Sequence, residues 1–321
     1  MPAPDPHSPP GPRMTVALVN NMPDSAFMDT EEQFRAAVGG FPAGADVTLE
    51  LYTIAEIPRS AAVAAQIRAR YGGLNDLWPR VPDALIITGT EPAQVQLPYE
   101  PYWPYLARLL EWAAASVPTV LLSCLAAHAS VLLFDGIERR PRAVKCSGIY
   151  PGVVAEPRDP LADGLPDIVS VPHSRVNDVA ETDLLDAGYR IVIGSGDSDV
   201  GWSVAARRCG ESEFVLCQGH PEYTTLSLLR EYRRDVRRCL FGRGAVPYPP
   251  LPDGYLNPEG VARLRTFADR AAAPGADPRA LWAAFPYEEV AAGVPNTWTA
   301  AAGALYGNWL RLARHAQPAG A

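Results

Sequence analysis

Three side chains that lie far apart in the sequence, those of Cys124, His220 and Glu222, could together perform acyl-group chemistry. A cysteine thiolate attacks a carbonyl carbon, a histidine moves the protons, and a carboxylate beside the histidine fixes its tautomer. Each residue also has an ordinary structural explanation. A free cysteine is usually a small buried apolar residue, and His220 and Glu222 could cap a loop and the first turn of the following helix. The pattern alone leaves both interpretations open.

Cys124 stands where a predicted strand turns into a predicted helix. It follows the apolar run 118–122 and precedes an Ala-rich segment. A helix N-terminus offers free backbone N–H groups and a partial positive charge, which favour a thiolate and a nearby oxyanion. His220 follows a second apolar run, 213–217. Because the carboxyl ends of parallel strands meet at one edge of a sheet, these side chains are predicted to come together.

Alternating strands and helices predict the fold class. Strand-like runs at 15–20, 46–52 and 84–89 alternate with helix-like segments such as 60–72 and 103–115. This order favours an α/β fold with a doubly wound, mainly parallel sheet flanked by helices. Further along the chain, the sequence predicts strands at 168–171, 190–194, 202–205 and 213–217, and helices at 224–240, 258–271 and 305–313.

The length of 321 residues suits one large α/β domain or two smaller ones. Residues 1–13 are rich in proline and are predicted to form a flexible arm. Residues 14–321 are predicted to form a single domain. A stretch rich in Pro, Gly and Ala at about 255–296 is interpreted as an insertion into that domain.

Composition and charge exclude several classes of protein. Lys and Arg number 28 against 36 Asp and Glu, so a net charge of -8 argues against binding to nucleic acid or to an anionic membrane. No apolar run reaches the ~18–20 residues of a membrane span, and the N-terminus lacks the pattern of a secretory signal, so the expected location is the cytoplasm. Five cysteines without a CxxC pair predict neither a disulfide framework nor a metal site.

Eleven short segments, in order along the chain, resemble one known family. They are Asn-Asn-Met-Pro (20–23), Thr-Glu-Glu-Gln-Phe (30–34), Ile-Ile-Thr-Gly-Thr-Glu-Pro (86–92), Tyr-Trp-Pro (102–104) with Leu-Glu-Trp (110–112), Cys-Leu-Ala-Ala-His-Ala (124–129), Lys-Cys-Ser-Gly-Ile-Tyr (145–150), Pro-His-Ser-Arg (172–175), Gly-His-Pro-Glu-Tyr (219–223), Glu-Tyr-Arg-Arg-Asp (231–235) and Asn-Trp-Leu (308–310). The chain is similar to homoserine O-acyltransferases of the homoserine O-succinyltransferase type, within the class I glutamine amidotransferase-like superfamily. The resemblance covers residues 14–250 and 298–311.

The resemblance implies transfer of an acyl group from acyl-coenzyme A to the side-chain hydroxyl of homoserine, a step of methionine biosynthesis. Cys124 would be the nucleophile, His220 the acid and base, and Glu222 the residue that orients the imidazole. The backbone N–H of Leu125 and one near Thr90 would stabilise the oxyanion. Acyl-coenzyme A would be a co-substrate, with no bound cofactor and no metal.

The resemblance also assigns residues to the two substrates. Arg234 would hold the carboxylate of the acceptor amino acid and Glu231 its ammonium group, although Arg234 could equally be a solvated helix arginine. Lys145, Ser174 and Arg175 lie in matching segments and are further candidates for the acceptor site. Ala93 occupies the position associated with acyl choice, where a small residue accompanies succinyl and a glutamate accompanies acetyl; the small side chain favours a succinyl donor.

Some residues depart from the family pattern and leave the acceptor open between homoserine, serine and related hydroxy amino acids. Asp24 and Ser25 stand where relatives carry a lysine, Leu125 replaces an aromatic residue, and His128 replaces a glutamine. Two other functions remain as alternatives: a glutamine amidotransferase-like cysteine hydrolase, and a noncatalytic binding descendant of the fold. Relatives form dimers, so a homodimer is an expectation by analogy only.

Overall fold

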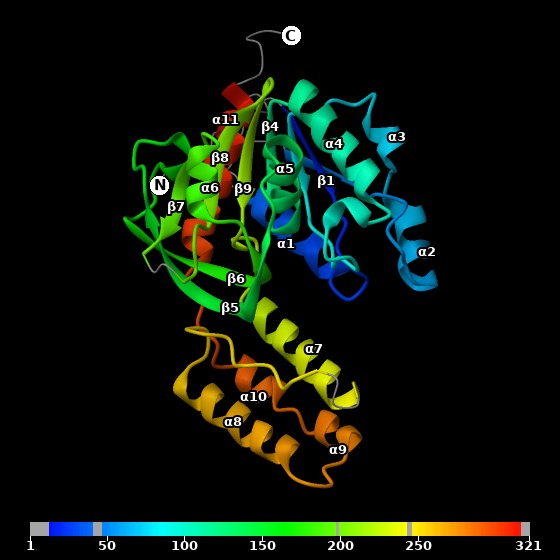
Figure 1. The fold of residues 1–321 in the computed structure, drawn as a ribbon, viewed down its shortest axis with the longest axis vertical. Coiled ribbons are helices and arrows are strands. Elements are labelled where there is room, and N and C mark those ends of the chain that lie inside the picture. Colours follow the sequence, from blue (N-terminus) through cyan, green and yellow to red (C-terminus); the bar gives the residue numbers. More distant parts are fainter. Residues whose placement is uncertain (1–12, 41–46, 197–198, 243–245, 316–321) are drawn as a thin grey trace, which may run out of the picture.

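A computed structural model describes residues 13–40, 47–196, 199–242 and 246–315. These residues form one nine-stranded sheet with helices on both faces, and a smaller lobe of helices below the sheet (Figure 1). All but the last residue of the predicted arm, 1–13, lies outside the described residues. None of the helices within these ranges has both the length and the apolar character of a membrane span.

The sheet has a parallel half and an antiparallel half, in the order β2-β1-β3-β4-β9-β8-β7-β5-β6. The parallel strands are β2 (Val47–Tyr52), β1 (Met14–Val19), β3 (Ala84–Ile87), β4 (Thr119–Ser123) and β9 (Ser212–Cys217). The antiparallel strands are β8 (Val204–Cys209), β7 (Arg190–Ser195), β5 (Arg140–Val154) and β6 (Ile168–Asp178). The predicted α/β class is confirmed. Parallel pairing is confined to the half of the sheet that runs from β2 to β9.

A two-residue turn explains where the antiparallel half begins. Strands β8 and β9 are joined by Gly210 and Glu211, and Gly210 has a φ of 59°. Glycine takes this conformation without a steric penalty, so the chain reverses at once and pairs antiparallel. Strand β9 therefore continues the parallel half through β4 and begins the antiparallel half through β8.

Helices cover both faces because the central strands are apolar on both sides. Helices α1 (Phe27–Gly39) and α11 (Thr299–His315) pack on one face, and α4 (Trp103–Ser116) and α5 (Leu125–Asp135) on the other. The predicted apolar face of α4 is buried at Leu106, Leu109 and Leu110. The remaining short elements outside the lobe are α2 (Ala61–Arg70), α3 (Leu74–Leu77), α6 (Glu181–Asp186) and the 3-10 turns Leu97–Tyr99 and Pro160–Ala162.

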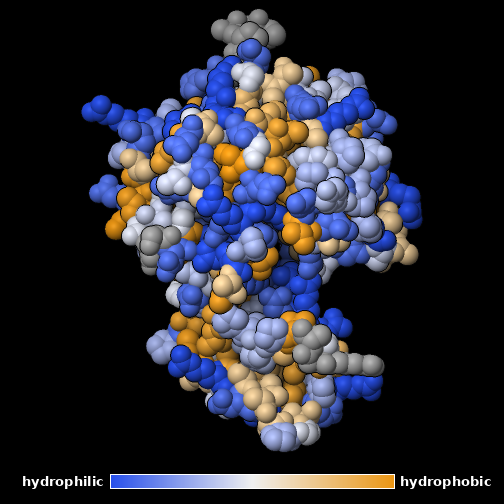
Figure 2. All heavy atoms as spheres, viewed as in Figure 1, coloured by the Kyte–Doolittle hydropathy of each residue, from blue (hydrophilic) through white to orange (hydrophobic). Residues whose placement is uncertain are grey.

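The helical lobe is built on α7 (Ser227–Phe241) and has an apolar core of its own. It contains α8 (Pro258–Ala272), α9 (Pro278–Ala283) and α10 (Tyr287–Ala291), where the sequence predicted one helix at 258–271. The molecule narrows between the sheet and this lobe, and hydrophilic residues gather at the narrowing (Figure 2). The lobe thus supplies a second wall beside the carboxyl ends of the parallel strands.

Candidate active site

Cys124 sits on a strained turn between β4 and α5. Its backbone has a φ of 49° and a ψ of -104°. Among the described residues, no other non-glycine residue has a positive φ. The backbone is held there because the N–H of Cys124 donates to the carbonyl of Cys217 at 2.7 Å, and the N–H of His128 donates to the carbonyl of Cys124 at 3.1 Å. Such a turn lifts a nucleophile above the sheet and aims it away from the strand. Cys124 is half-buried.

The neighbouring strand brings His220 and Glu222 to the same place. Strands β4 and β9 pair in parallel with Ser123 opposite Cys217, so the residues after both strands share one edge of the sheet. His220 Nδ1 lies 2.8 Å from a carboxylate oxygen of Glu222, and that same oxygen accepts a hydrogen bond from Ser123 at 3.2 Å. Both His220 and Glu222 are buried. The structure therefore brings together the three residues of the predicted triad.

The charge of Glu222 controls the protonation of His220. Burial by itself lowers the pKa of His220, but the Glu222 carboxylate and the hydrogen bonds of the ring with Cys124 and Glu222 outweigh it. The net result is a pKa well above the usual value. A protonated His220 ring beside Cys124 can donate its proton to a leaving group at this site.

The residues predicted to stabilise an oxyanion lie next to Cys124. Leu125 is the first residue of α5, where backbone N–H groups have no partner within the helix. Leu125 and Thr90 both line the cavity that holds Cys124. Gly89 makes this packing possible, because a Cβ placed on Gly89 would lie 2.8 Å from the Cβ of Leu125 and 3.1 Å from its backbone N.

Gly89→Ala is therefore expected to lower kcat by displacing the Leu125 N–H and to cost about 1–3 kcal/mol of stability through overpacking. Steady-state rates and thermal unfolding of the variant measure the two effects. Gly39→Ala is the matched control, because a Cβ at Gly39 meets nothing within 4 Å. Unchanged kcat in Gly89→Ala would contradict an oxyanion role for Leu125.

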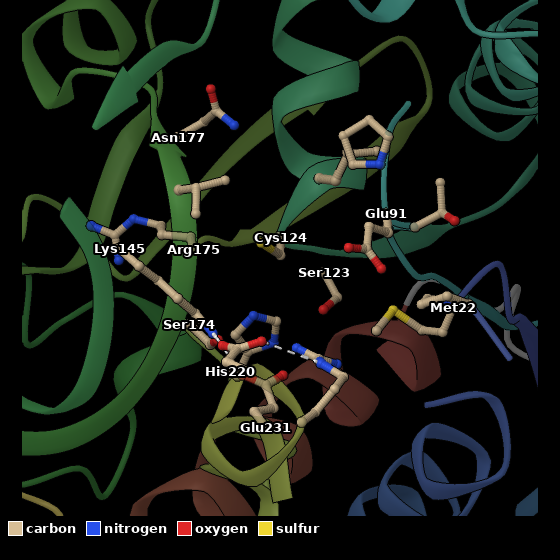
Figure 3. A pocket seen from close by; sticks show the side chains of 18 of the residues that line it. Met22, Glu91, Ser123, Cys124, Lys145, Ser174, Arg175, Asn177, His220 and Glu231 are labelled. Carbon is tan, nitrogen blue, oxygen red and sulfur yellow. Dashed lines mark hydrogen bonds and ion pairs between the residues drawn. The ribbon is translucent and has the colours of Figure 1, made fainter. Parts of the chain in front are cut away.

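The triad opens into a cavity of about 630 Å³ between the edge of the sheet and the helical lobe. The loops after β1, β3, β4 and β9 contribute to its walls, together with β6, α7 and the segment 246–250. In Figure 3, Cys124 and His220 lie between Lys145 and Ser174 on one side and Glu91 and Met22 on the other. A cavity of this size accommodates a small substrate together with part of a larger one.

The residues predicted for the acceptor form one polar cluster in this cavity. Glu231 accepts hydrogen bonds from Ser174 and, at 2.7 Å, from the hydroxyl of Tyr223. Burial by itself raises the pKa of Glu231, but the charges of Lys145 and Arg234 and the hydrogen bond from Ser174 lower it below its usual value. Glu231 is thus a carboxylate, and Arg234 lies three residues further along α7 with its Nε buried and without a hydrogen-bond partner.

Two predicted substrate residues are placed differently. Arg175 lines the cavity, but its guanidinium is bound to Asp178 at 2.6 Å and also to His173 and the carbonyl of Val200. It therefore positions β6 rather than presenting free N–H groups to a substrate. Ala93 is exposed and is absent from the described cavity wall, which ends at Pro92 in this loop.

Sequence reasoning missed two residues of the site, Tyr223 and Asp235. The ring of Tyr223 stacks on His220 with centroids 4.4 Å apart, and its hydroxyl reaches Glu231, so it joins the triad to the acceptor cluster. Asp235 holds Lys145 at 2.7 Å. Both residues stand inside segments that carried the family resemblance, but nothing in their spacing distinguished them from ordinary helix and loop positions.

The comparisons with known proteins bear on the family. The model of the homoserine O-succinyltransferase family (HTS) matches residues 11–318. The chain belongs to the homoserine O-succinyltransferase family. A relative named homoserine O-succinyltransferase from Methylorubrum extorquens is 44% identical over 300 residues, covering 94% of this chain and 87% of the relative. Another so named, from Rhodopseudomonas palustris, is 39% identical over 295 residues, covering 92% and 86%. The predicted family and the predicted class of enzyme, an acyltransferase, are confirmed.

One solved structure supports the fold. The structure described as SMU.1228c has a TM-score of 0.50 and 14% identity, and covers 93% of this chain and 99% of its own. A glutamine amidotransferase from Thermotoga maritima has a TM-score of 0.46 and 12% identity, covering 94% and 98%. The homoserine O-succinyltransferase family thus supplies the closer relationship, and the structural likeness speaks for the fold alone.

His128, a departure from the family pattern, changes no charge at the site. Its Nε2 lies 3.0 Å from the side-chain oxygen of Gln218, which also accepts the N–H of Val179 at 3.2 Å. Because that oxygen only accepts, Nε2 carries the proton. Burial lowers the pKa of His128 to about 4, with Arg175 and Arg139 acting in the same direction and the Gln218 hydrogen bond opposing them. His128 is neutral at pH 7, like the glutamine of the family pattern.

Asp24, another departure, is not among the residues that line the cavity. Its carboxylate accepts the backbone N–H of Ser60 at 2.7 Å and lies 3.7 Å from Arg59. These contacts hold the loop after β1.

Among the described residues, no group of three or more His, Cys, Asp and Glu side chains is arranged to hold a metal ion.

Proposed function

We propose that this chain transfers a succinyl group from succinyl-coenzyme A to the side-chain hydroxyl of homoserine, through a thioester on Cys124. The observation that carries the proposal is the strained Cys124 beside the His220–Glu222 pair, in a cavity that also holds the Glu231 and Arg234 cluster. The family and the names of its relatives support the choice of substrates.

In the first half of the reaction, the Cys124 thiolate attacks the thioester carbonyl of the donor. The negative charge on the carbonyl oxygen is stabilised by the N–H of Leu125 and one from the Gly89–Thr90 segment. When the tetrahedral intermediate collapses, the bond to the coenzyme A sulfur breaks and His220 donates its proton to that sulfur. Coenzyme A leaves, and the succinyl group remains on Cys124.

In the second half, the neutral His220 takes the proton from the homoserine hydroxyl as its oxygen attacks the acyl-enzyme. The bond to the sulfur breaks, and O-succinylhomoserine and the Cys124 thiolate with protonated His220 are formed. The acceptor is oriented by Arg234 on its carboxylate and Glu231 on its ammonium group. Every proton moves through His220, so the scheme requires only the two substrates.

The experiment that tests the proposal incubates the full chain with succinyl-coenzyme A or acetyl-coenzyme A and with homoserine or serine. We expect O-succinylhomoserine as the main product, with stoichiometric release of coenzyme A, measured by mass spectrometry and a thiol assay. L-glutamine in place of both substrates tests hydrolysis in the amidotransferase manner. Ammonia from glutamine, with no coenzyme A released from either donor, would overturn the proposal in favour of a cysteine hydrolase. Binding of homoserine or coenzyme A without turnover would favour a noncatalytic role.

Arg234→Lys is expected to raise KM for homoserine about 10-fold or more, because a lysine cannot make the bidentate pair that a guanidinium makes with a carboxylate. KM for the acyl donor should change less than about threefold. Arg237→Lys is the matched control, since Arg237 is an exposed arginine of the same helix that packs over Trp282. Equal rises in both KM values would place Arg234 outside the acceptor site.

A further inference from the structure

The cavity holds one cation that no carboxylate of the described residues neutralises. Its walls carry five Lys and Arg side chains: Arg139, Lys145, Arg175, Arg234 and Arg238. All but Arg139 have an Asp or Glu oxygen within ion-pairing distance; the closest contact is 2.7 Å for Lys145, 2.6 Å for Arg175, 3.6 Å for Arg234 and 2.9 Å for Arg238. Within the part of the chain that the structure describes, Arg139 has none. A positive charge without an ion-paired carboxylate is available to an anionic ligand.

The guanidinium of Arg139 is anchored in place and still has a free donor. Its Nη2 donates to the backbone carbonyl of Val95 at 3.0 Å and approaches that of Gln94 at 3.4 Å. Its Nε is buried and has no hydrogen-bond partner. A buried donor without a partner costs about 1–3 kcal/mol, a cost that a ligand acceptor would remove. The side chain is therefore rigidly held but incompletely satisfied.

Cys124 is among the groups that act electrostatically on Arg139. Burial lowers the pKa of Arg139, while the charges of Tyr102, Glu100 and Cys124 act in the opposite direction. Cys124 and Arg139 also line the same cavity. An acyl chain attached to Cys124 thus lies in the same cavity as a cation that has no ion-paired carboxylate among the described residues.

We propose that Arg139 is a specificity-determining residue that binds the distal carboxylate of a dicarboxylic acyl group on the donor and on the acyl-enzyme. The proposal rests on the proposed acyl transfer and names the residue that selects its donor. Arg139 also holds the carbonyls of residues 94 and 95. The loop that contains Ala93, associated with acyl choice by resemblance, is thereby fixed to the same guanidinium. Donor selection then depends on an attractive contact, in addition to the room that a small residue at position 93 leaves.

The test compares two donors of equal chain length, succinyl-coenzyme A and butyryl-coenzyme A, with the full chain and its variants. In the wild type, kcat/KM for the succinyl donor is expected to exceed that for the butyryl donor by about 30-fold, the value of a charge-assisted hydrogen bond. Arg139→Gln should remove most of this ratio by lowering only the succinyl rate. Arg139→Lys, which keeps the charge, should restore part of it. Arg140→Gln is the matched control, because Arg140 is exposed and pairs with Asp183.

The outcomes separate this proposal from the acyl transfer on which it rests. An Arg139→Gln variant that loses both rates equally would show that Arg139 only supports the loop, and an unchanged ratio would show that it contacts no carboxylate. The wild-type ratio does not depend on a variant that folds, and a value near 1 would overturn the proposal by itself. In each of these cases acylation of Cys124 still occurs. Absence of any acyl adduct from any donor would instead contradict the acyl transfer.

Discussion

Incubation with succinyl-coenzyme A is expected to add one succinyl group to Cys124, and Cys124→Ala to abolish that adduct and lower turnover by about 10⁴-fold. The size follows from the loss of the covalent route, because general acid catalysis and binding cannot replace a nucleophile. The adduct is expected on Cys124 in particular, because this cysteine is on the strained turn with positive φ at the end of β4. Intact-mass and peptide mass spectrometry locate the adduct.

Cys239→Ala is the matched control for this experiment. Cys239 is the other free cysteine that is half-buried rather than fully buried, and it is on α7, outside the described lining of the cavity. Its loss should leave both the adduct and the turnover unchanged. If the adduct persists in Cys124→Ala, or moves to Cys239, the proposed acyl-enzyme is wrong. Omission of homoserine should raise the fraction of Cys124 that carries the adduct, because no acceptor is then present to remove the acyl group.

The parallel half of the sheet could be predicted from the sequence because each of its central strands is a short apolar run. Strands such as β3 and β4 are buried along their whole length, and this is what a continuous apolar run indicates. The same signal placed Cys124 and His220 after two apolar runs, and the family resemblance then assigned them catalytic roles. The parallel pairing of β4 with β9, with Ser123 opposite Cys217, brings the residues after the two strands to the same edge of the sheet.

The antiparallel half and the lobe were harder to predict for physical reasons. Strand β5 alternates irregularly between buried and exposed residues, contains prolines, and shifts its register with β6 between Pro141 and Cys146. No simple period marks such a strand. Helices α9 and α10 are only six and five residues long, and are stabilised by contacts such as Arg233 over the ring of Trp282. Interactions between distant residues, rather than local pattern, define these elements.

The acceptor cluster likewise depends on contacts between distant residues rather than on local sequence pattern. Arg234 and Glu231 could be assigned only by resemblance, since an arginine among other helix arginines carries no signal of its own. The structure supplies the missing distinction, because Arg234 lines the cavity while Arg233 and Arg237 lie over an aromatic ring of the lobe. The contact of Tyr223 with both His220 and Glu231 likewise depends on how the chain turns after β9.

Glu222→Gln is expected to lower kcat/KM for the acyl donor about 10²- to 10³-fold and to shift its alkaline limb to lower pH. Burial alone would lower the pKa of His220, and the negative charge of Glu222 is the largest of the effects that raise it. Glutamine keeps the size of the side chain but removes that charge, so the imidazolium loses its proton at a lower pH. Because the thiolate and imidazolium pair is the form that attacks the donor, activity then falls earlier as pH rises.

Initial rates of coenzyme A release, measured across the neutral and alkaline range, give the pH profile of kcat/KM for the two proteins. Glu211→Gln is the control, because Glu211 is an exposed carboxylate that pairs with Arg208 on the surface. Its profile should coincide with that of the wild type. Ser123→Ala should fall between the two, since it removes one hydrogen bond to Glu222 and leaves the charge in place. An alkaline limb in Glu222→Gln at the wild-type pH would mean that Glu222 does not set the protonation of His220, and the assignment of these two residues would have to be abandoned.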